Sequence, residues 1–143
     1  KKNIISGLQH AINISGNNIT IQSCTIRSDS NASSILIRNK SHGTQLANCI
    51  ITGIKNNSGV LINDKSKCFI SKCQISGNRG SGVDVQGGSH LIIRDSSIFS
   101  NQKSGMFVHS FGEVEAFNCD VKLNRYAGTI TTSSSSACEL LPV

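Results

Sequence analysis

Apolar residues along this chain occur in short alternating runs that return at a fixed spacing. Two neighbouring stretches, residues 75–97 and 98–120, are each 23 residues long and match slot by slot. Gly, Asn and Ser separate the runs, and no stripe with the 3.6-residue period of a helix persists across a window of about 11 residues. This pattern is typical of a repeat protein built from short strands. The matched pairs include Ile75 with Ile98, Gly82 with Gly105, Val83 with Met106, Val85 with Val108 and Leu91 with Val114.

The repeat extends over nearly the whole chain, and its last unit loses the pattern after Thr131. Short strands that cannot bury a face alone must stack on neighbouring units, about 4.8 Å apart. We therefore predict an all-β fold: a right-handed parallel β-helix (solenoid) of about six coils with a period of about 23 residues. The predicted β-helix repeat domain covers residues 1–132, and residues 133–143 form a degenerate last coil or C-terminal tail. The units open at Ile5, Ile26, Ile51, Ile75, Ile98 and Val121.

Composition predicts an aliphatic interior. The 143-residue chain has no Trp and an aromatic content of 4%, whereas Ile, Val and Leu fill the repeat slots. No apolar run approaches the roughly 20 residues of a membrane span, and the first residues lack the apolar segment of a signal peptide. We expect no membrane association. Because the sequence begins inside a repeat, we also expect flanking domains in a longer chain.

Four cysteines share one slot, two residues before the apolar residue that opens the next unit. Ser96 fills this slot in the remaining full unit, so the slot suits small, half-polar side chains. We interpret the thiols as free and structural, which favours a reducing compartment, the cytoplasm or nucleus. Disulfides between adjacent coils remain an alternative, since the coil spacing lies within the allowed Cα separation. Five glycosylation sequons point the other way, toward secretion. The cysteines are Cys24, Cys49, Cys73 and Cys119, and the sequons begin at Asn13, Asn18, Asn31, Asn39 and Asn56.

The sequence predicts no catalytic residues, no metal site and no cofactor. Calcium binding or acid and base catalysis on a β-helix needs carboxylates close together, and no slot carries acids on adjacent units. Asp84, for example, falls between Leu61 and Phe107. The four histidines share no slot and no CxxC pair occurs, which argues against zinc.

An asparagine recurs at one turn slot of the later units. Asn78, Asn101 and Asn124 are spaced by 23 residues, so their amides are predicted to form a ladder of hydrogen bonds along the stack. We expect the slot to have a left-handed backbone, which Asn tolerates. The role assigned to these residues is structural.

Two outward-facing slots carry apolar residues on successive units. In a strand, a residue between two inward-facing residues points outward, so these slots form strips on the surface. Exposed apolar strips mark a surface that binds protein or is covered by another part of the chain, and both alternatives stay open. The candidate protein-binding residues are Leu36, Leu61, Asp84, Phe107 and Ile130 in the first strip, and Phe69 and Ile92 in the second.

A net charge of +6 and a pI near 9.2 raise the question of a polyanionic partner. Lys55, Arg79, Lys103 and Arg125 fall at or near one turn slot and form a candidate polyanion-binding edge. Aromatic residues that would stack on bases do not accompany them, and no nucleic-acid-binding motif occurs. We therefore expect a solvated edge and no nucleic-acid partner.

The unit I-x-x-N-x-x-x-G-h-x-h followed by h-x-h-x-x-C/S-x-I, where h is apolar, resembles the CASH-type parallel β-helix repeats of carbohydrate-binding proteins and sugar hydrolases. It is similar to the β-helix regions of F-box-only proteins and of the SHC SH2-domain-binding protein and Nessun Dorma group. The matching positions, including Asn78, Gly82, Val83 and Ile98, belong to the scaffold. The resemblance implies a non-catalytic interaction scaffold: substrate recruitment to a ubiquitin ligase, or a signalling or cytokinesis adaptor. The alternative that it implies is a carbohydrate-binding or pectate-lyase-like, glycan-active β-helix.

Overall fold

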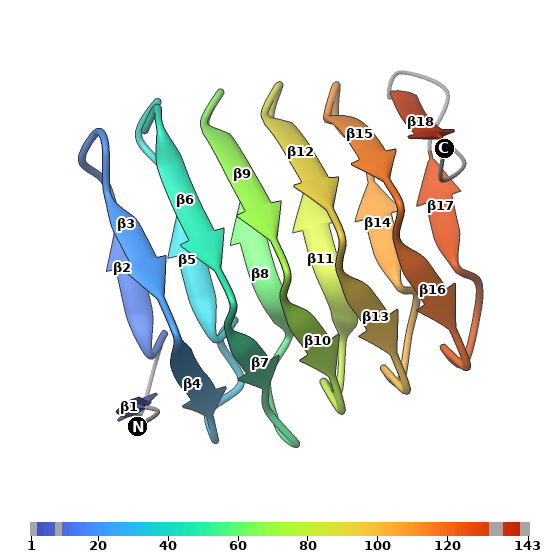
Figure 1. Ribbon diagram of the computed structural model, residues 1–143, viewed down its shortest axis with the longest axis horizontal. Coiled ribbons are helices and arrows are strands. Elements are labelled where there is room, and N and C mark those ends of the chain that lie inside the picture. Colours follow the sequence, from blue (N-terminus) through green and yellow to red (C-terminus); the bar gives the residue numbers. More distant parts are fainter. Residues whose placement is uncertain (1–2, 8–9, 132–135, 141–143) are drawn as a thin grey trace.

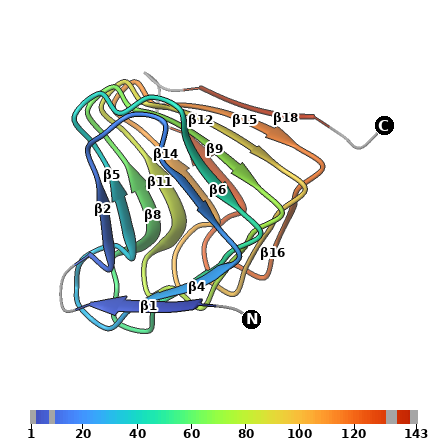
Figure 2. The same ribbon diagram turned by 60° about the vertical axis from the view of Figure 1, so that its left-hand side comes forward.

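The chain winds into a solenoid in which every strand pairs in parallel with the strand one coil away (Figure 1). The computed structural model describes residues 3–7, 10–131 and 136–140. The described strands form three sheets of six strands each, and the coil has three sides when the stack is turned (Figure 2). Hydrogen bonds therefore run along the stack, and no helix occurs among the described residues.

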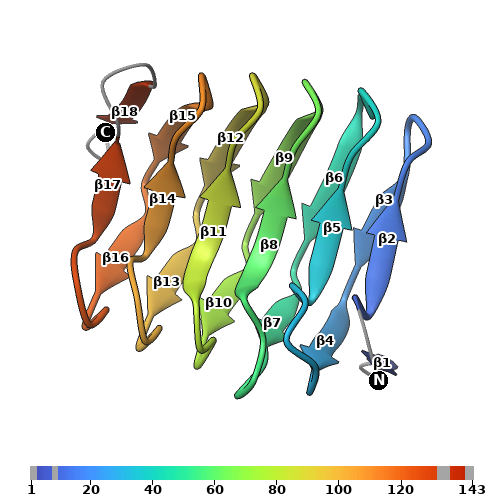
Figure 3. The same cartoon turned by 180° about the vertical axis from the view of Figure 1, so that it is seen from behind.

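Each coil contributes one strand to sheet A, one to sheet B and one to sheet C. Sheet A contains β1 (Asn3–Gly7), β4 (Cys24–Ser28), β7 (Ile50–Thr52), β10 (Gln74–Ser76), β13 (Ser97–Phe99) and β16 (Asp120–Lys122). Sheet B, seen from behind in Figure 3, contains β2 (Ile12–Ile14), β5 (Ile35–Ile37), β8 (Ser58–Ile62), β11 (Ser81–Val85), β14 (Met106–Val108) and β17 (Thr129–Thr131). Sheet C contains β3 (Thr20–Gln22), β6 (Thr44–Ala47), β9 (Lys67–Ser71), β12 (His90–Arg94), β15 (Glu113–Phe117) and β18 (Ser136–Leu140).

The strand register is the one that the 23-residue period predicts. Ile75 pairs with Ile98, Val83 with Met106, and Leu91 with Val114. The inward side chains of the three sheets meet in one aliphatic core, which the aliphatic composition also predicted. The largest fully buried side chains are Ile26, Ile35, Ile37, Leu46, Ile51, Ile62, Ile70, Ile75, Leu91, Ile93, Ile98 and Met106.

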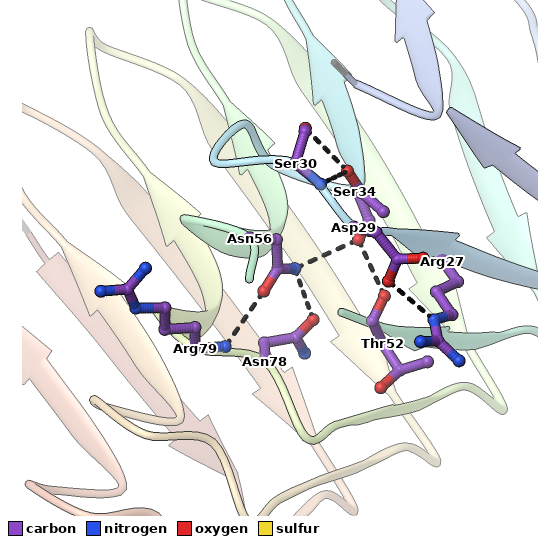
Figure 4. A network of polar contacts seen from close by, with 9 residues as sticks. Arg27, Asp29, Ser30, Ser34, Thr52, Asn56, Asn78 and Arg79 are labelled. Carbon is purple, nitrogen blue, oxygen red and sulfur yellow. Dashed lines mark hydrogen bonds and ion pairs between the residues drawn. The ribbon is translucent and has the colours of Figure 1, made fainter. Parts of the chain in front are cut away.

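The predicted asparagine ladder is present and begins one coil earlier than the sequence indicated. Asn56 donates from Nδ2 to Asn78 Oδ1 at 2.7 Å, Asn78 to Asn101 Oδ1 at 2.8 Å, and Asn101 to Asn124 Oδ1 at 2.9 Å. Ser34 continues the series, since its Oγ accepts from Asn56 Nδ2 at 3.1 Å (Figure 4). Asn56 had been assigned to a sequon, but its side chain is 1% exposed and lies within the ladder.

The expectation of left-handed backbone at the ladder residues is wrong. Positive φ occurs one residue earlier, at Gly77 (67°), Ser100 (54°) and Leu123 (55°). These residues turn the chain at the end of each sheet A strand. The asparagines that follow are thereby free to point inward, where their amides bond along the stack.

The last coil keeps the register after its hydrophobic pattern ends. β18 pairs with β15, with Glu113 opposite Ser136, so the backbone repeat of 23 residues continues. The sequence lost the pattern because Ala137 and Glu139 occupy the slots opposite Val114 and Ala116. Residues 136–140 therefore continue the coil, while residues 133–135 and 141–143 of the predicted last coil or tail lie outside the described part. Within that part there is no helix long and apolar enough to cross a membrane.

Candidate functional site

The first predicted strip is assembled on the outer face of sheet B. Asn13, Leu36, Leu61, Asp84 and Phe107 pair in sequence on successive strands. Leu36 is 8% exposed and therefore buried, whereas Leu61, Asp84 and Phe107 are partly exposed. Ile130 pairs with Phe107 through its backbone, and its side chain lies outside the described part. The accessible strip is thus shorter than the sequence predicted, because it begins at Leu61.

A histidine that the sequence analysis did not assign to this strip contacts two of its members. His109 Nε2 lies 2.9 Å from Asp84 Oδ1, and the imidazole stacks on the Phe107 ring with centroids 4.3 Å apart. Burial raises the pKa of the Asp84 carboxyl above its ordinary value, although the charge on His109, the hydrogen bond from His109 and the charge on Lys103 act to lower it. His109 was not predictable from equivalent positions of the repeat, because the residue opposite Asp84 is Phe107. His109 lies two residues further along the chain and reaches Asp84 diagonally.

The second strip lies on the outer face of sheet C. Gln45, Phe69, Ile92 and Glu115 pair in register, and Phe69 and Ile92 are partly exposed. They line a small pocket of 160 Å³ together with Cys68 and His90. Glu115, which follows Ile92 in this series, has a partner on the neighbouring coil. His90 Nε2 lies 2.9 Å from Glu115 Oε1, again diagonally across two strands.

The cysteine slot lies where the chain passes from sheet C to sheet A. A residue with positive φ precedes each cysteine, for example Asn48 (53°) before Cys49 and Lys72 (51°) before Cys73. Cys49 Sγ lies 3.3 Å from the Ala47 carbonyl oxygen, and Cys73 Sγ lies 3.3 Å from that of Ser71, two residues back in each case. Cys24, Cys49, Cys68 and Cys73 are buried free thiols.

The thiols differ in acidity. The side chains of Cys49 and Cys73 share a hydrogen bond, which lowers the pKa of Cys49 and raises the pKa of Cys73. Burial raises the pKa of Cys73 further. Burial alone raises the pKa of Cys68, which lies in β9 on the inner side of sheet C. Cys49, Cys68 and Cys73 are all buried, and no group of three metal-ligating side chains occurs among the described residues.

The four basic candidates come together in one pocket. They lie in four successive turns between sheet A and sheet B, residues 53–57, 77–80, 100–105 and 123–128, which we call the A-to-B turns. This pocket, of 510 Å³, is adjacent to a second one of 420 Å³ that contains Asp84 and Phe107, and Asn57, Lys103 and Tyr126 line both. The basic edge and the strip on sheet B are therefore neighbouring surfaces. The basic residues of the larger pocket are Lys55, Arg79, Lys103 and Arg125.

Comparison with protein-family models decides the family. A model described as right-handed beta helix region matches residues 1–141. The chain belongs to the right-handed β-helix family. This assignment agrees with the three parallel sheets and with the predicted hand of the coil. No curated protein and no solved structure matched the chain.

Proposed function

We propose that this β-helix is a non-catalytic scaffold that binds a protein partner through the outer face of sheet B. The observation that carries the proposal is the continuous surface formed by Leu61, Asp84 and Phe107 on β8, β11 and β14. These residues are in register on three adjacent strands, and Asp84 and Phe107 border a pocket of 420 Å³. A partly apolar, flat strand surface with a hollow beside it suits a protein side chain inserted into the hollow.

The electrostatics of the strip are consistent with binding rather than catalysis. Asp84 is held by His109, and His109 Nδ1 lies 3.1 Å from Ser110 Oγ, so both imidazole nitrogens have partners. The other acid and histidine pair, Glu115 with His90, is on a different sheet. A glycan-cleaving site needs two cooperating carboxylates, and each of these acids is paired with one histidine instead. We place the second strip, Phe69 and Ile92, as an additional contact surface.

The larger role that fits this proposal is that of an adaptor. A rod with laterally exposed strand faces can present a bound segment to another domain of the same chain. We therefore propose substrate recruitment to a ubiquitin ligase, or signalling and cytokinesis scaffolding, in the cytoplasm or nucleus, where interior thiols stay reduced.

The test compares proteins captured from cell extract by the full-length wild type and by the double variant Leu61→Lys, Phe107→Lys. A matched control is Ile19→Lys, Phe111→Lys, which introduces the same two charges at apolar residues that are 39% and 71% exposed and lie outside both strips and outside the A-to-B turns. Circular dichroism verifies that each variant is folded. We expect at least one partner to be captured equally by the wild type and the control, and in an amount lower by about tenfold or more by the strip variant. Identical captures by all three proteins would contradict it.

A further inference from the structure

The A-to-B turns carry positively charged side chains and no negatively charged ones. Their sequences are GIKNN, GNRG, SNQKSG and LNRYAG, so each turn supplies one cation and none contains Asp or Glu. Lys55, Arg79, Lys103 and Arg125 are all exposed. In the part of the chain that the structure describes, none of the four forms an ion pair. The ion pairs that do form are Arg27 with Asp29, His90 with Glu115, His109 with Asp84 and Lys122 with Asp120.

The ladder asparagines hold these turns in place. Asn56 Oδ1 accepts from the backbone N–H of Arg79 at 3.0 Å, and the Arg79 side chain extends away from the ladder (Figure 4). On the next coils, the N–H of Gln102 donates to the Asn78 carbonyl oxygen at 2.8 Å, and that of Arg125 to the Asn101 carbonyl oxygen at 3.0 Å. The cations are thus attached to an ordered, buried support, and their side chains line a pocket of 510 Å³.

We propose that this basic groove binds an extended acidic peptide segment lying along the stack. Four successive turns span about 14 Å at the interstrand spacing, and an extended peptide covers that distance in about four to five residues. A short run of Glu or Asp can therefore place carboxylates against cations from several coils at once. Asn31, Asn57 and Gln102, which also line the groove, supply amide groups that can bond to a peptide backbone.

The lining favours a peptide over a nucleic acid. Binding of single strands combines basic residues with several aromatic side chains on which bases stack. Tyr126 is the aromatic residue among those that line the groove, and the Arg125 guanidinium lies over its ring, 5.9 Å from the centroid. The inference rests on the charge and shape of the groove, and it holds whether or not the strip on sheet B binds a partner.

The experiment measures fluorescence anisotropy of a labelled peptide with about five glutamates, enough to span the groove, and of the same peptide with glutamines. The glutamate peptide is expected to bind and the glutamine peptide to bind at least about tenfold more weakly. Raising NaCl from about 50 mM to about 500 mM should weaken binding, because exposed charges are screened. Equal binding of both peptides, or no binding of either, would overturn the proposal.

Variants locate the site on the protein. Arg79→Glu, Arg125→Glu should weaken binding of the glutamate peptide by about tenfold or more, and Arg79→Gln, Arg125→Gln by less. The matched control Lys40→Glu, Lys65→Glu changes the net charge equally at exposed residues outside the groove and should keep affinity within about twofold. An equal loss in the control would show that net charge alone attracts the peptide, which overturns the site.

Three further comparisons separate this site from the alternatives. Gln102 follows Asn101 as Arg79 follows Asn78, so Gln102→Arg adds a fifth cation to the groove and should tighten peptide binding. A single-stranded oligouridine that bound more tightly than the peptide through the same residues would replace the peptide with nucleic acid. If the Leu61→Lys, Phe107→Lys variant still binds the peptide, the groove and the strip are separate binding sites. If the folded variant no longer binds the peptide, they are not separate.

Discussion

At the residue scale, the side chain of Asn101 connects three coils. Its Oδ1 accepts from the side chain and the backbone N–H of Asn78, at 2.8 and 3.1 Å, and its Nδ2 donates to Asn124 Oδ1 and the Ile75 carbonyl oxygen, at 2.9 and 3.2 Å. Asn101 is 2% exposed, so water cannot replace these bonds. A buried amide with all four partners supplies both hydrogen bonds and a fixed coil register.

We expect Asn101→Leu to lower the free energy of unfolding by about 2–4 kcal/mol, because it removes the buried acceptor of the Asn78 side-chain Nδ2 and backbone N–H. The neighbouring exposed residue gives the control, Gln102→Leu, which should change stability by less than about 0.5 kcal/mol. Urea unfolding followed by circular dichroism measures both. Equal stabilities for the two variants would contradict a stabilising ladder.

Asp84 predicts a pH dependence. Its folded-state pKa is raised above the ordinary 3.8, so the folded state holds the proton more tightly than the unfolded state. The slope of unfolding free energy with pH is then negative for this group, and its carboxylate costs stability above the folded-state pKa. That cost disappears as the pH falls through the folded-state pKa toward 3.8.

We therefore expect the melting temperature of the wild type, relative to that of Asp84→Asn, to rise as the pH is lowered from about 7 toward about 4. Differential scanning calorimetry across this range measures the difference at each pH. A difference that stays constant, or that shrinks on acidification, would contradict the assigned direction.

At the element scale, close approach of neighbouring coils explains a column of glycines at the start of the sheet B strands. A Cβ on Gly82 would lie 2.5 Å from Ile98 Cγ2 and 2.7 Å from the Gly105 carbonyl oxygen. The same slot on the adjacent coils is Gly59 and Gly105, and each faces the amide of a ladder asparagine. The glycine column therefore makes room for the asparagine ladder.

Gly82→Ala should destabilise the protein by about 1–3 kcal/mol, because the added methyl group overlaps a buried side chain and backbone. Gly16→Ala is the matched control, since its Cβ would meet its nearest atom, Ile19 Cδ1, at 3.9 Å. Thermal unfolding of the two variants checks the contrast. A stability loss of the same size in Gly16→Ala would contradict a cost that comes from crowding in the glycine column, because the effect of this substitution on the unfolded chain is stabilising.

The strands were predictable because the sequence carries their register directly. Matching residues such as Ile75 and Ile98 pair at a spacing of 23, and the period-2 alternation sets which residues face inward. Comparison of residues at equivalent positions of the repeat could not predict the two acid and histidine pairs, because the partners lie diagonally across neighbouring strands. The pairs are Asp84 with His109 and Glu115 with His90. The grouping of Lys103 with Arg79 and Arg125 was only partly predictable, because Lys103 lies one residue after their slot, which Gln102 fills on its coil.

At the scale of the whole molecule, the solenoid is a sum of coils that contact only their neighbours. Gln74 and Ser97 occupy equivalent positions in the register, as do Ile75 and Ile98. Removing residues 75–97 would join Gln74 to Ile98 and leave every remaining strand with a partner in the same sheet. The asparagine and glycine columns also stay continuous in this variant, because Asn56 and Asn101 then lie on neighbouring coils, as do Gly59 and Gly105.

We expect the variant that lacks residues 75–97 to fold as a shorter β-helix with a lower melting temperature, because stability in a solenoid grows with the number of interfaces between coils. Its denaturant m-value should fall by about a sixth, in proportion to the surface buried. The control deletion, residues 75–85, removes about half a coil and joins Gln74, the first residue of β10, to the turn after β11. That variant should not fold, since the turn between sheets B and C and then β12 of sheet C would follow β9 where strands of sheets A and B belong. Circular dichroism and urea unfolding compare the two deletions, and a folded half-coil variant or an unfolded full-coil variant would contradict interchangeable coils.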